Sequence, residues 1–223
     1  MDAQRLSVVI PALNEAQGIR AALEALAPLR ARGHEVIVAD GGSADGTVEL
    51  AQPLCDRVVQ AVRGRAQQMN AGARVASGDA LLFLHADTRL PANADHMIFQ
   101  GLCLARWGRF DVRIEGRHPM LKVVAGAMNL RSRLTGIATG DQAIFVRRDA
   151  FPGFPEIALM EDIAFSSAMK RGGRPACLRS RAVTSGRRWE SRGVLRTIVL
   201  MWRLRLLYFL GATPERLARR YHA

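Results

Sequence analysis

One apolar run constrains the fold of this chain more than any other feature. Leu81-Leu82-Phe83-Leu84 is fully apolar, and it leads through His85 and Ala86 to Asp87. Such a run, bounded by polar residues, predicts a strand buried on both faces, as in a parallel α/β sheet. Ligands of open α/β sheets bind beyond the carboxyl ends of the strands. Asp87 is therefore expected at a functional site.

The first part of the chain repeats this pattern. A second apolar run, residues 36–39, ends in Asp40, so two strands deliver an acid to one predicted crevice. Strand and helix patterns alternate, which predicts an α/β fold with a mostly parallel, Rossmann-like sheet flanked by helices. The expected strands are 6–10, 35–39, 57–62 and 80–84, and the expected helices are 16–32, 47–54 and 66–75.

Beyond Pro91 the alternation is less regular. Residues 110–115 alternate in the way of an antiparallel strand. Further strands are expected at 143–147 and 175–183, and helices at 93–105, 121–134, 160–171 and 194–210. No repeat or linker divides the sequence, so we expect a single domain over residues 1–223. Its parts are a nucleotide-binding half (1–91), an acceptor and catalytic half (92–192) and basic amphipathic C-terminal helices (193–223).

Cysteine usage and the N-terminus predict the compartment. Cys55, Cys103 and Cys177 lie far apart in the sequence. This spacing fits neither a disulfide framework nor a zinc site. The N-terminus has no basic segment followed by a long apolar stretch, so no signal peptide is expected. These features predict a cytoplasmic protein.

Positive charge is concentrated at the C-terminus. The net charge is +12, and residues 179–223 hold eleven arginines against Glu190 and Glu215, a net charge of +9. A basic segment of this kind predicts an anionic partner, such as phosphates or acidic lipid, although an arginine-rich composition alone is the alternative. Zinc-finger spacing and the aromatic motifs of RNA-binding domains are missing, so a nucleic-acid partner is not expected.

The last long helix has a mixed face pattern. Residues 194–210 contain Arg196, Arg203 and Arg205, and three arginines make a poor membrane span. Arg196 and Arg203 share one face, and another face is apolar, with Trp202, Leu206 and Phe209. This pattern is typical of a helix at a membrane interface, which predicts peripheral contact with anionic lipid at the inner face of a membrane. A helix packed on the domain is the alternative.

Four short motifs follow one another along the chain. They are P-A-L-N-E (11–15), D-G-G-S-A-D-G-T (40–47), L-F-L-H-A-D-T (82–88) and M-E-D (160–162). A dinucleotide-binding domain would need G-x-G-x-x-G after the first strand, where P-A-L-N-E stands instead. In this order and spacing, the motifs resemble the family 2 glycosyltransferases of GT-A fold. Residues 64–73, followed by H-A-D, resemble a bacterial subgroup assigned to arsenosugar biosynthesis.

The resemblance implies a site for a nucleotide-diphosphate sugar. Asp40 would bind the base or ribose, or else only cap the turn that follows it. Asn14 and Glu15 would hold the nucleotide, or else cap a helix. Arg65 would meet the base or the diphosphate, or else lie solvated at the surface. The implied site comprises Pro11, Ala12, Asn14, Glu15, Asp40, Arg65, Ala86 and Asp87.

The resemblance also implies a divalent cation, Mn²⁺ or Mg²⁺. Family members carry D-x-D, whose last acid binds the metal, and Asp87 fills that place. His85 stands at the position of the first acid. An imidazole suits Mn²⁺ better than Mg²⁺, so Asp87 and His85 are the expected metal ligands. A packing or hydrogen-bonding role is the alternative for His85.

The catalytic assignment falls on Glu161-Asp162. The resemblance implies that Asp162 removes the proton from the acceptor hydroxyl, with Glu161 in support. Stabilisation of a helix N-terminus is the alternative. Gly140 and Asp141 would line the acceptor site. Arg188-Trp189 resembles the end of the Q-x-x-R-W signature of processive members, with Ser185 at the glutamine position, and would hold diphosphate or sugar.

These residues predict an inverting glycosyltransferase. It would move a sugar from a UDP- or GDP-linked donor to a hydroxyl acceptor, lipid-linked if the basic helix meets a membrane. The alternatives are a nucleotidyltransferase of related fold, which would need a glycine-rich loop after the first strand, and a non-catalytic nucleotide- or membrane-binding protein.

Overall fold

A computed structural model describes residues 4–222 of the chain as one α/β unit. Its sheet has eight strands in the order β3-β2-β1-β4-β7-β6-β8-β5. The strands are β1 (Leu6–Ala12), β2 (Glu35–Asp40), β3 (Arg57–Gln60), β4 (Ala80–Phe83), β5 (Thr88–Arg89), β6 (Trp107–Glu115), β7 (Ile144–Arg147) and β8 (Ala176–Ser185).

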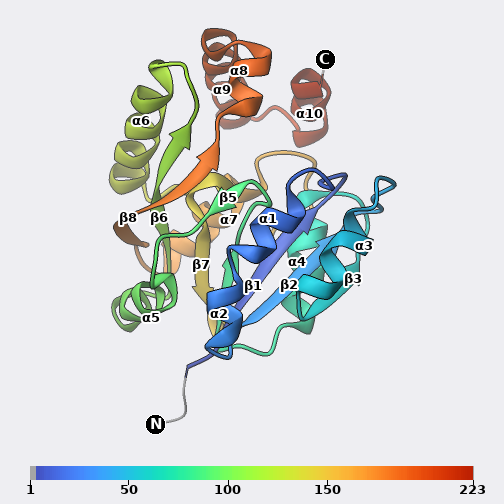
Figure 1. Cartoon of the computed structure of the whole chain (residues 1–223). Coiled ribbons are helices and arrows are strands. Elements are labelled where there is room, and N and C mark those ends of the chain that lie inside the picture. The colour runs from blue at the N-terminus through green and yellow to red at the C-terminus, as the bar shows by residue number, and fades with distance from the viewer. Residues whose placement is uncertain (1–3, 223) are drawn as a thin grey trace.

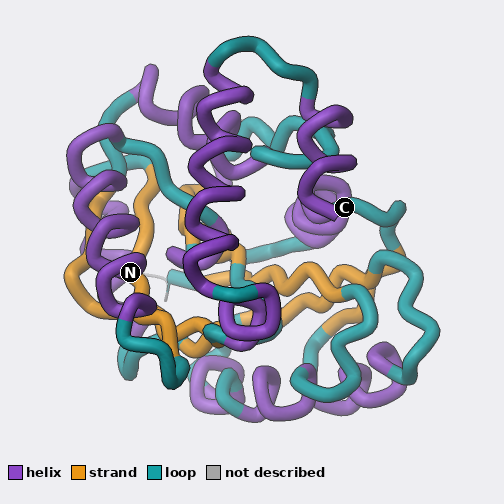
Figure 2. The backbone as a smooth tube through the Cα atoms, turned by 90° about the horizontal axis from the view of Figure 1, so that it is seen from above, coloured by secondary structure: helices purple, strands orange, loops and turns teal. Residues whose placement is uncertain are grey.

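Helices lie on both sides of the strands, as the view from above shows (Figure 2). They are α1 (Ile19–Glu24), α2 (Ala27–Ala31), α3 (Thr47–Ala51), α4 (Arg65–Val75), α5 (Ala94–Leu104), α6 (Met120–Thr135), α7 (Glu161–Met169), α8 (Arg187–Arg192), α9 (Val194–Phe209) and α10 (Pro214–His222). Short 3-10 turns occupy 52–54, 140–142, 148–150 and 170–172. Helices α8, α9 and α10 gather at the top of Figure 1, at the end opposite the N-terminus.

The first four strands have the predicted parallel arrangement. β1 pairs in parallel with both β2 and β4, and β2 pairs in parallel with β3. Alternate residues of β1 pack on opposite faces: Val8 joins the core cluster that contains Leu23 of α1, and Val9 joins the cluster that contains Met69 of α4. Burial on both faces explains why these strands are continuous apolar runs.

The second half of the sheet is mixed. β7 is antiparallel to β4 and β6, β6 is parallel to β8, and β5 is antiparallel to β8. The expectation that residues 110–115 form an antiparallel strand is wrong, because these residues pair with β8 in parallel; only Trp107–Arg109 pair antiparallel, with β7. Alternation in a sequence reports that one face is buried, and it does not report the direction of the neighbouring strand.

Prolines shorten two of the expected helices. The helix expected at 16–32 is divided into α1 and α2, with Pro28 at the second position of α2. A proline ring clashes with the carbonyl four residues earlier, here that of Glu24, where α1 ends. In a similar way α3 ends at Ala51, and a 3-10 turn with Pro53 as its second residue follows.

The C-terminal helices cover the start of α7. Leu204 of α9 and Leu217 of α10 pack in one apolar cluster with Met160 and Ile163, which flank Glu161-Asp162. These helices therefore place basic residues beside the predicted catalytic acids. Within residues 4–222, no helix is long and apolar enough to cross a membrane.

Candidate active site

Asp40 ends β2 as a buried carboxylate with one oxygen unused. Its Oδ2 accepts hydrogen bonds from the backbone amides of Gly42 (2.9 Å) and Ser43 (3.0 Å), which is the turn-capping role. Its Oδ1 is also buried, and no group among the described residues donates to it. Buried acceptors are nearly always paired, so this oxygen is free for a donor that a ligand supplies. Turn capping and ligand binding are thus compatible at this residue.

The loops after β1 and β2 hold each other in place. Asn14 adopts a left-handed backbone (φ 54°), donates its amide to Ser43 Oγ (2.9 Å) and accepts from the amide of Ala44 through Oδ1 (3.0 Å). Asn14 therefore supports the Asp40 loop and caps no helix. Half-buried Pro11 and buried Ala12 are the last residues of β1, paired with Ala39 and Asp40.

Gln68 of α4 is a site residue that the sequence analysis missed. Its buried amide donates to the carbonyls of Ala12 (2.6 Å) and Ala39 (3.0 Å), so it ties the ends of β1 and β2 together. The signal available in the sequence was a polar side chain three residues after Arg65, on a helix whose other inward positions are small or apolar.

Glu15, His85 and Asp87 lie close enough to interact electrostatically. Burial and then the charge of Asp87 raise the pKa of Glu15, while Arg187, Arg188 and His85 oppose the rise. The structure thus brings Glu15 of the first motif close to the motif that contains His85 and Asp87.

Asp87 lies in the tight turn between β4 and β5 and is exposed. Its Oδ1 receives only long hydrogen bonds, of 3.4 Å, from the hydroxyls of Thr88 and Thr184. The preceding residue, Ala86, is buried in the core and fixes the turn. An exposed carboxylate with weak protein contacts is available to a ligand.

His85 begins this turn, and its side chain is largely enclosed, with 17% of its surface exposed. Its Nδ1 lies 3.3 Å from Oδ1 of Asp141, and its Nε2 is buried without a hydrogen-bond partner among the described residues. A Cβ placed on Gly140 would come within 2.4 Å of Nε2, so the ring packs directly on the Gly140 backbone. This packing matches the alternative role expected for His85.

Gly140 and Asp141 belong to a 3-10 turn that touches the catalytic candidates. Thr139 and Gln142 form a capping box that fixes this turn. Burial would raise the pKa of Asp141, but the hydrogen bond and charge of His85, then Arg65 and Arg188, hold it below its usual value. Asp141 is therefore an anion that links His85 to the arginines.

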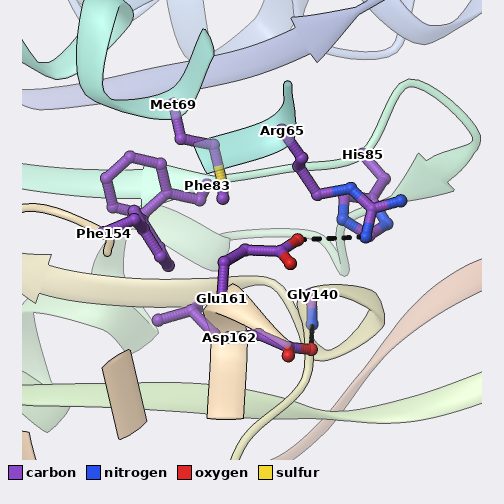
Figure 3. Close-up of a pocket in the computed structure, with 9 residues that line it drawn as sticks. Arg65, Met69, Phe83, His85, Gly140, Phe154, Glu161 and Asp162 are labelled. Carbon is purple, nitrogen blue, oxygen red and sulfur yellow. Dashed lines mark hydrogen bonds and ion pairs between the residues drawn. The ribbon is translucent and has the colours of Figure 1, made fainter. Parts of the chain in front are cut away.

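Glu161 and Asp162 begin α7 and line a small pocket with Arg65, His85 and Gly140 (Figure 3). Arg65 Nη1 lies 3.2 Å from Oε1 of the buried Glu161. Burial lowers the pKa of Arg65, but Glu161, then Asp162 and Asp141, outweigh this effect and raise it. Arg65 is thus an ion-pair partner of Glu161, while 41% of its side chain remains exposed.

Asp162 has an unusual environment for a carboxylate. Burial, then the charge of Glu161, raises the pKa of Asp162, against Arg65, Arg205 and the Gly140 amide. The Gly140 amide donates to Oδ2 of Asp162 (3.1 Å), and the amide of the next residue, Ile163, donates to Oδ1 (2.7 Å). A raised pKa suits a group that must accept a proton near neutral pH.

Arg188 and Trp189 are adjacent in the sequence, but their side chains lie in different environments. Arg188 is exposed at the start of α8, 3.5 Å from the hydroxyl of Tyr221 in α10. Its charge reaches Asp141 and Glu15. Trp189 instead packs against the apolar cluster of Val112, Leu121 and Val194. The structure therefore brings Arg188 to the site and gives Trp189 the packing role.

The environments of Asp87 and His85 show whether each residue could bind the expected divalent cation. Among the described residues, no cluster of three His, Cys, Asp or Glu side chains could hold a metal ion. Mg²⁺ and related ions, however, bind through one or two carboxylates together with substrate phosphates. Asp87 fits that mode, since it is exposed and weakly bonded. His85 does not fit it through the enclosed Nε2.

Comparison with known proteins adds the family. Residues 7–104 match the family described as Glycosyl transferase family 2. The match covers somewhat less than half of the chain, and within it the chain is similar to the family 2 glycosyltransferases. Over 157 residues the chain is 30% identical to a PGL/p-HBAD biosynthesis glycosyltransferase of Mycobacterium bovis. The aligned region covers 66% of this chain and 57% of the relative. The chain thus spans little more than half the length of that relative. The narrower arsenosugar subgroup stays a prediction.

Solved structures agree on the fold. S. aureus TarS in complex with UDP-GlcNAc superposes with a TM-score of 0.65 at 18% identity, over 81% of this chain and 58% of TarS. A mannosyltransferase from Pyrobaculum calidifontis in complex with GDP-Man and Mn²⁺ gives a TM-score of 0.66 at 20% identity, over 98% of this chain and 69% of that protein. The predicted GT-A fold of this chain is confirmed.

Proposed function

We propose that this chain transfers a sugar from a nucleotide-diphosphate sugar to a hydroxyl acceptor, with inversion at the anomeric carbon. The observation that carries the proposal is the acid pair at the start of α7, buried Glu161 and half-buried Asp162, which lines a pocket together with Arg65 and His85. The match of residues 7–104 to family 2 glycosyltransferases, and the similar fold of proteins solved in complex with UDP-GlcNAc or GDP-Man, support this assignment.

The donor would lie along the carboxyl ends of the parallel strands. Asp40 Oδ1, which has no donor among the described residues, would accept a hydrogen bond from the base or ribose. Asp87 would hold a divalent cation together with the diphosphate, and the cation would neutralise the leaving group's charge. Arg188, which is exposed beside Asp141, would add a positive charge near that diphosphate.

Asp162 would act as the general base. Its carboxylate takes the proton of the acceptor hydroxyl as the hydroxyl oxygen bonds to the anomeric carbon. The bond from that carbon to the diphosphate oxygen breaks on the opposite face, and the nucleoside diphosphate leaves with the bonding electrons. Glu161 stays paired with Arg65 and keeps the pKa of Asp162 raised.

The decisive test is a donor panel. UDP- and GDP-sugars are incubated with the chain, Mn²⁺ and candidate hydroxyl acceptors, and release of nucleoside diphosphate is measured beside thermal shift. Release that depends on both donor and acceptor supports the transferase. Release of pyrophosphate from a sugar phosphate and a nucleoside triphosphate would instead support a nucleotidyltransferase. Donor binding without turnover over the acceptor panel would support a non-catalytic binding protein.

We also propose that α9 rests on an anionic membrane surface. Val194, Thr197 and Leu204 of α9 are buried, so the helix packs on the domain as the alternative expectation had it. Its outer face is nevertheless apolar and 61–73% exposed, at positions 4, 7, 11 and 14 residues after Leu195: Val199, Trp202, Leu206 and Phe209. This spacing places all five side chains on one face.

The charged residues beside that apolar face indicate what binds to it. Exposed Arg196 and Arg203 border it, within a C-terminal segment of net charge +9. Apolar side chains flanked by arginines match the acyl boundary and phosphates of anionic lipid. A chain held in this way would act at the inner face of a membrane, where a lipid-linked hydroxyl acceptor is accessible.

A further inference from the structure

Two arginines beside Asp162 have unused hydrogen-bond donors. Arg131 of α6 and Arg205 of α9 come from helices far apart in the sequence. Nε and Nη2 of Arg131 and Nε of Arg205 are buried, and none of them finds an acceptor among the described residues. Neither side chain takes part in any ion pair that the described residues form.

The two guanidinium groups also repel each other. Burial, then the charge of Arg205, lowers the pKa of Arg131 to about 10, with Asp162 opposing. Burial lowers the pKa of Arg205 as well, against Asp162 and Asp141. Buried cations are normally paired, because an unpaired charge loses its hydration without compensation. The unpaired donors and positive charge of these two groups favour the binding of an anion.

The acids nearby do not supply that anion. Asp162 uses Oδ2 for the Gly140 amide and Oδ1 for the Ile163 amide. Asp141 is paired with His85. The charge of Asp162 acts on both arginines and that of Asp141 acts on Arg205, but neither acid forms an ion pair with them. The unused donors are therefore available to an anion that binds from outside the chain.

The position of the pair relative to Asp162 indicates which molecule brings the anion. Arg65, from α4 of the nucleotide-binding half, approaches the acid pair through Glu161. Arg131 and Arg205 approach Asp162 from the acceptor half and the C-terminal helices. Since the general base touches the acceptor hydroxyl, a group close to that hydroxyl on the acceptor reaches the arginines.

We propose that Arg131 and Arg205 bind a phosphate group of the acceptor, so that the acceptor is a phosphorylated alcohol. That the phosphate belongs to the acceptor rests on the proposed function, whereas the anion site itself does not depend on it. Guanidinium forks match phosphate oxygens, and two positive charges match a phosphate monoester, which carries close to two negative charges at neutral pH. A water-soluble phosphate ester and a lipid phosphate present the same chemistry to the pair.

The test measures phosphate binding directly. The full chain is saturated with Mn²⁺ and UDP or GDP, so that the diphosphate site is filled, and titrated with inorganic phosphate, glycerol 3-phosphate and short-chain phosphatidic acid. R131Q and R205Q should each weaken phosphate binding about ten- to a hundred-fold, because each removes charged hydrogen bonds. K122Q removes an exposed positive charge from α6, the helix of Arg131, so it is the matched control and should bind phosphate as the unaltered chain does.

Thermal stability separates a binding role from a structural one. Removal of an unpaired buried charge should leave the melting temperature of R131Q and R205Q unchanged or raise it, and added phosphate should stabilise the unaltered chain more than either variant. Tighter binding of glycerol 3-phosphate or of phosphatidic acid identifies a soluble or a lipid acceptor. Equal phosphate affinity in the unaltered chain and both variants would overturn the inference. Phosphate binding that depends on the pair, without nucleoside diphosphate release from any donor, would contradict the proposed transferase and leave the anion site standing.

Discussion

The backbone amide of Gly140 donates a hydrogen bond to Oδ2 of Asp162 over 3.1 Å. The same glycine lies so close to His85 that an added Cβ would come within 2.4 Å of Nε2. Segments after β4, before β7 and at the start of α7 therefore meet at one backbone position. The carboxylate proposed as general base is held by this contact, which makes its placement depend on a residue without a side chain.

Gly140→Ala should displace the turn from Asp162. The new methyl group cannot fit against the imidazole, so the Gly140 amide or His85 must move. Because small misplacements of catalytic groups can cost about a hundred-fold in rate, we expect a loss of that order in kcat with little change in nucleotide affinity. Gly126→Ala on α6 is the control, because a Cβ there meets no atom within 4 Å. Equal loss of kcat in both variants would contradict this account.

Asp40→Asn should weaken nucleotide binding and leave the fold intact. The amide oxygen can still accept from Gly42 and Ser43, whereas an NH₂ group would replace the unused Oδ1. A donor there cannot accept from a base or ribose, so we expect the dissociation constant of UDP or GDP to rise about ten-fold or more. Calorimetry measures the affinity, and an unchanged melting temperature shows that the turn persists. Unaltered affinity would remove Asp40 from the nucleotide site.

Asp87→Asn should abolish the metal dependence of nucleotide binding. The carboxylate is exposed and its contacts with Thr88 and Thr184 are long, so loss of its charge removes a metal ligand without disturbing the core. Calorimetry with UDP and GDP, with and without Mn²⁺, gives the difference that the metal makes. If the variant keeps that difference, another residue holds the cation.

Much of the first half of the sheet follows from the sequence. Strands that are buried on both faces, such as 36–39 and 81–84, consist of apolar residues only. Their continuous apolar runs can therefore be recognised in the sequence, together with the acid that follows each run. The division of α1 from α2 also has a visible cause in Pro28. The two-residue strand β5 has no such signal, because its pairing with β8 is set by the turn at Asp87.

The surroundings of Asp162 depend on contacts that the sequence does not reveal. Arg131 and Arg205 lie on α6 and α9, and neither belongs to a motif, so only the folded chain brings them to Asp162. Trp189 shows the opposite case: its motif suggested a sugar, and the adjoining cluster of Val112, Leu121 and Val194 buries it. Side chains on irregular connections and on packed helices are positioned by tertiary contacts that local patterns do not record.

The apolar face of α9 should bind vesicles that contain anionic lipid. We expect sedimentation with such vesicles, weakening as salt rises, and little with neutral vesicles, because the arginines supply the selectivity. Trp202→Ser with Phe209→Ser should reduce binding, since both side chains are exposed and their loss leaves the core unchanged. Val123→Ser on α6, also exposed, is the control. Equal partition to neutral and anionic vesicles, or none to either, would contradict the proposal.

The pH dependence of transfer follows from the surroundings of Asp162. Its pKa is raised by burial and by Glu161, and the active form is the carboxylate. Activity should therefore fall as the pH drops through this raised pKa, at a higher pH than the value of about 3.9 for an ordinary aspartate. Since Arg205 lowers the pKa of Asp162, R205Q should move this acid limb to still higher pH.

The most direct test is the single-turnover rate of sugar transfer in the unaltered chain and in Asp162→Asn, measured on the donor and acceptor that the panel identifies. The account predicts that the variant binds nucleotide with normal affinity, loses about 10²–10⁴ in rate, and loses the acid limb of the pH profile. A variant that transfers sugar at nearly the unaltered rate, with the same acid limb, would show that another group takes the proton.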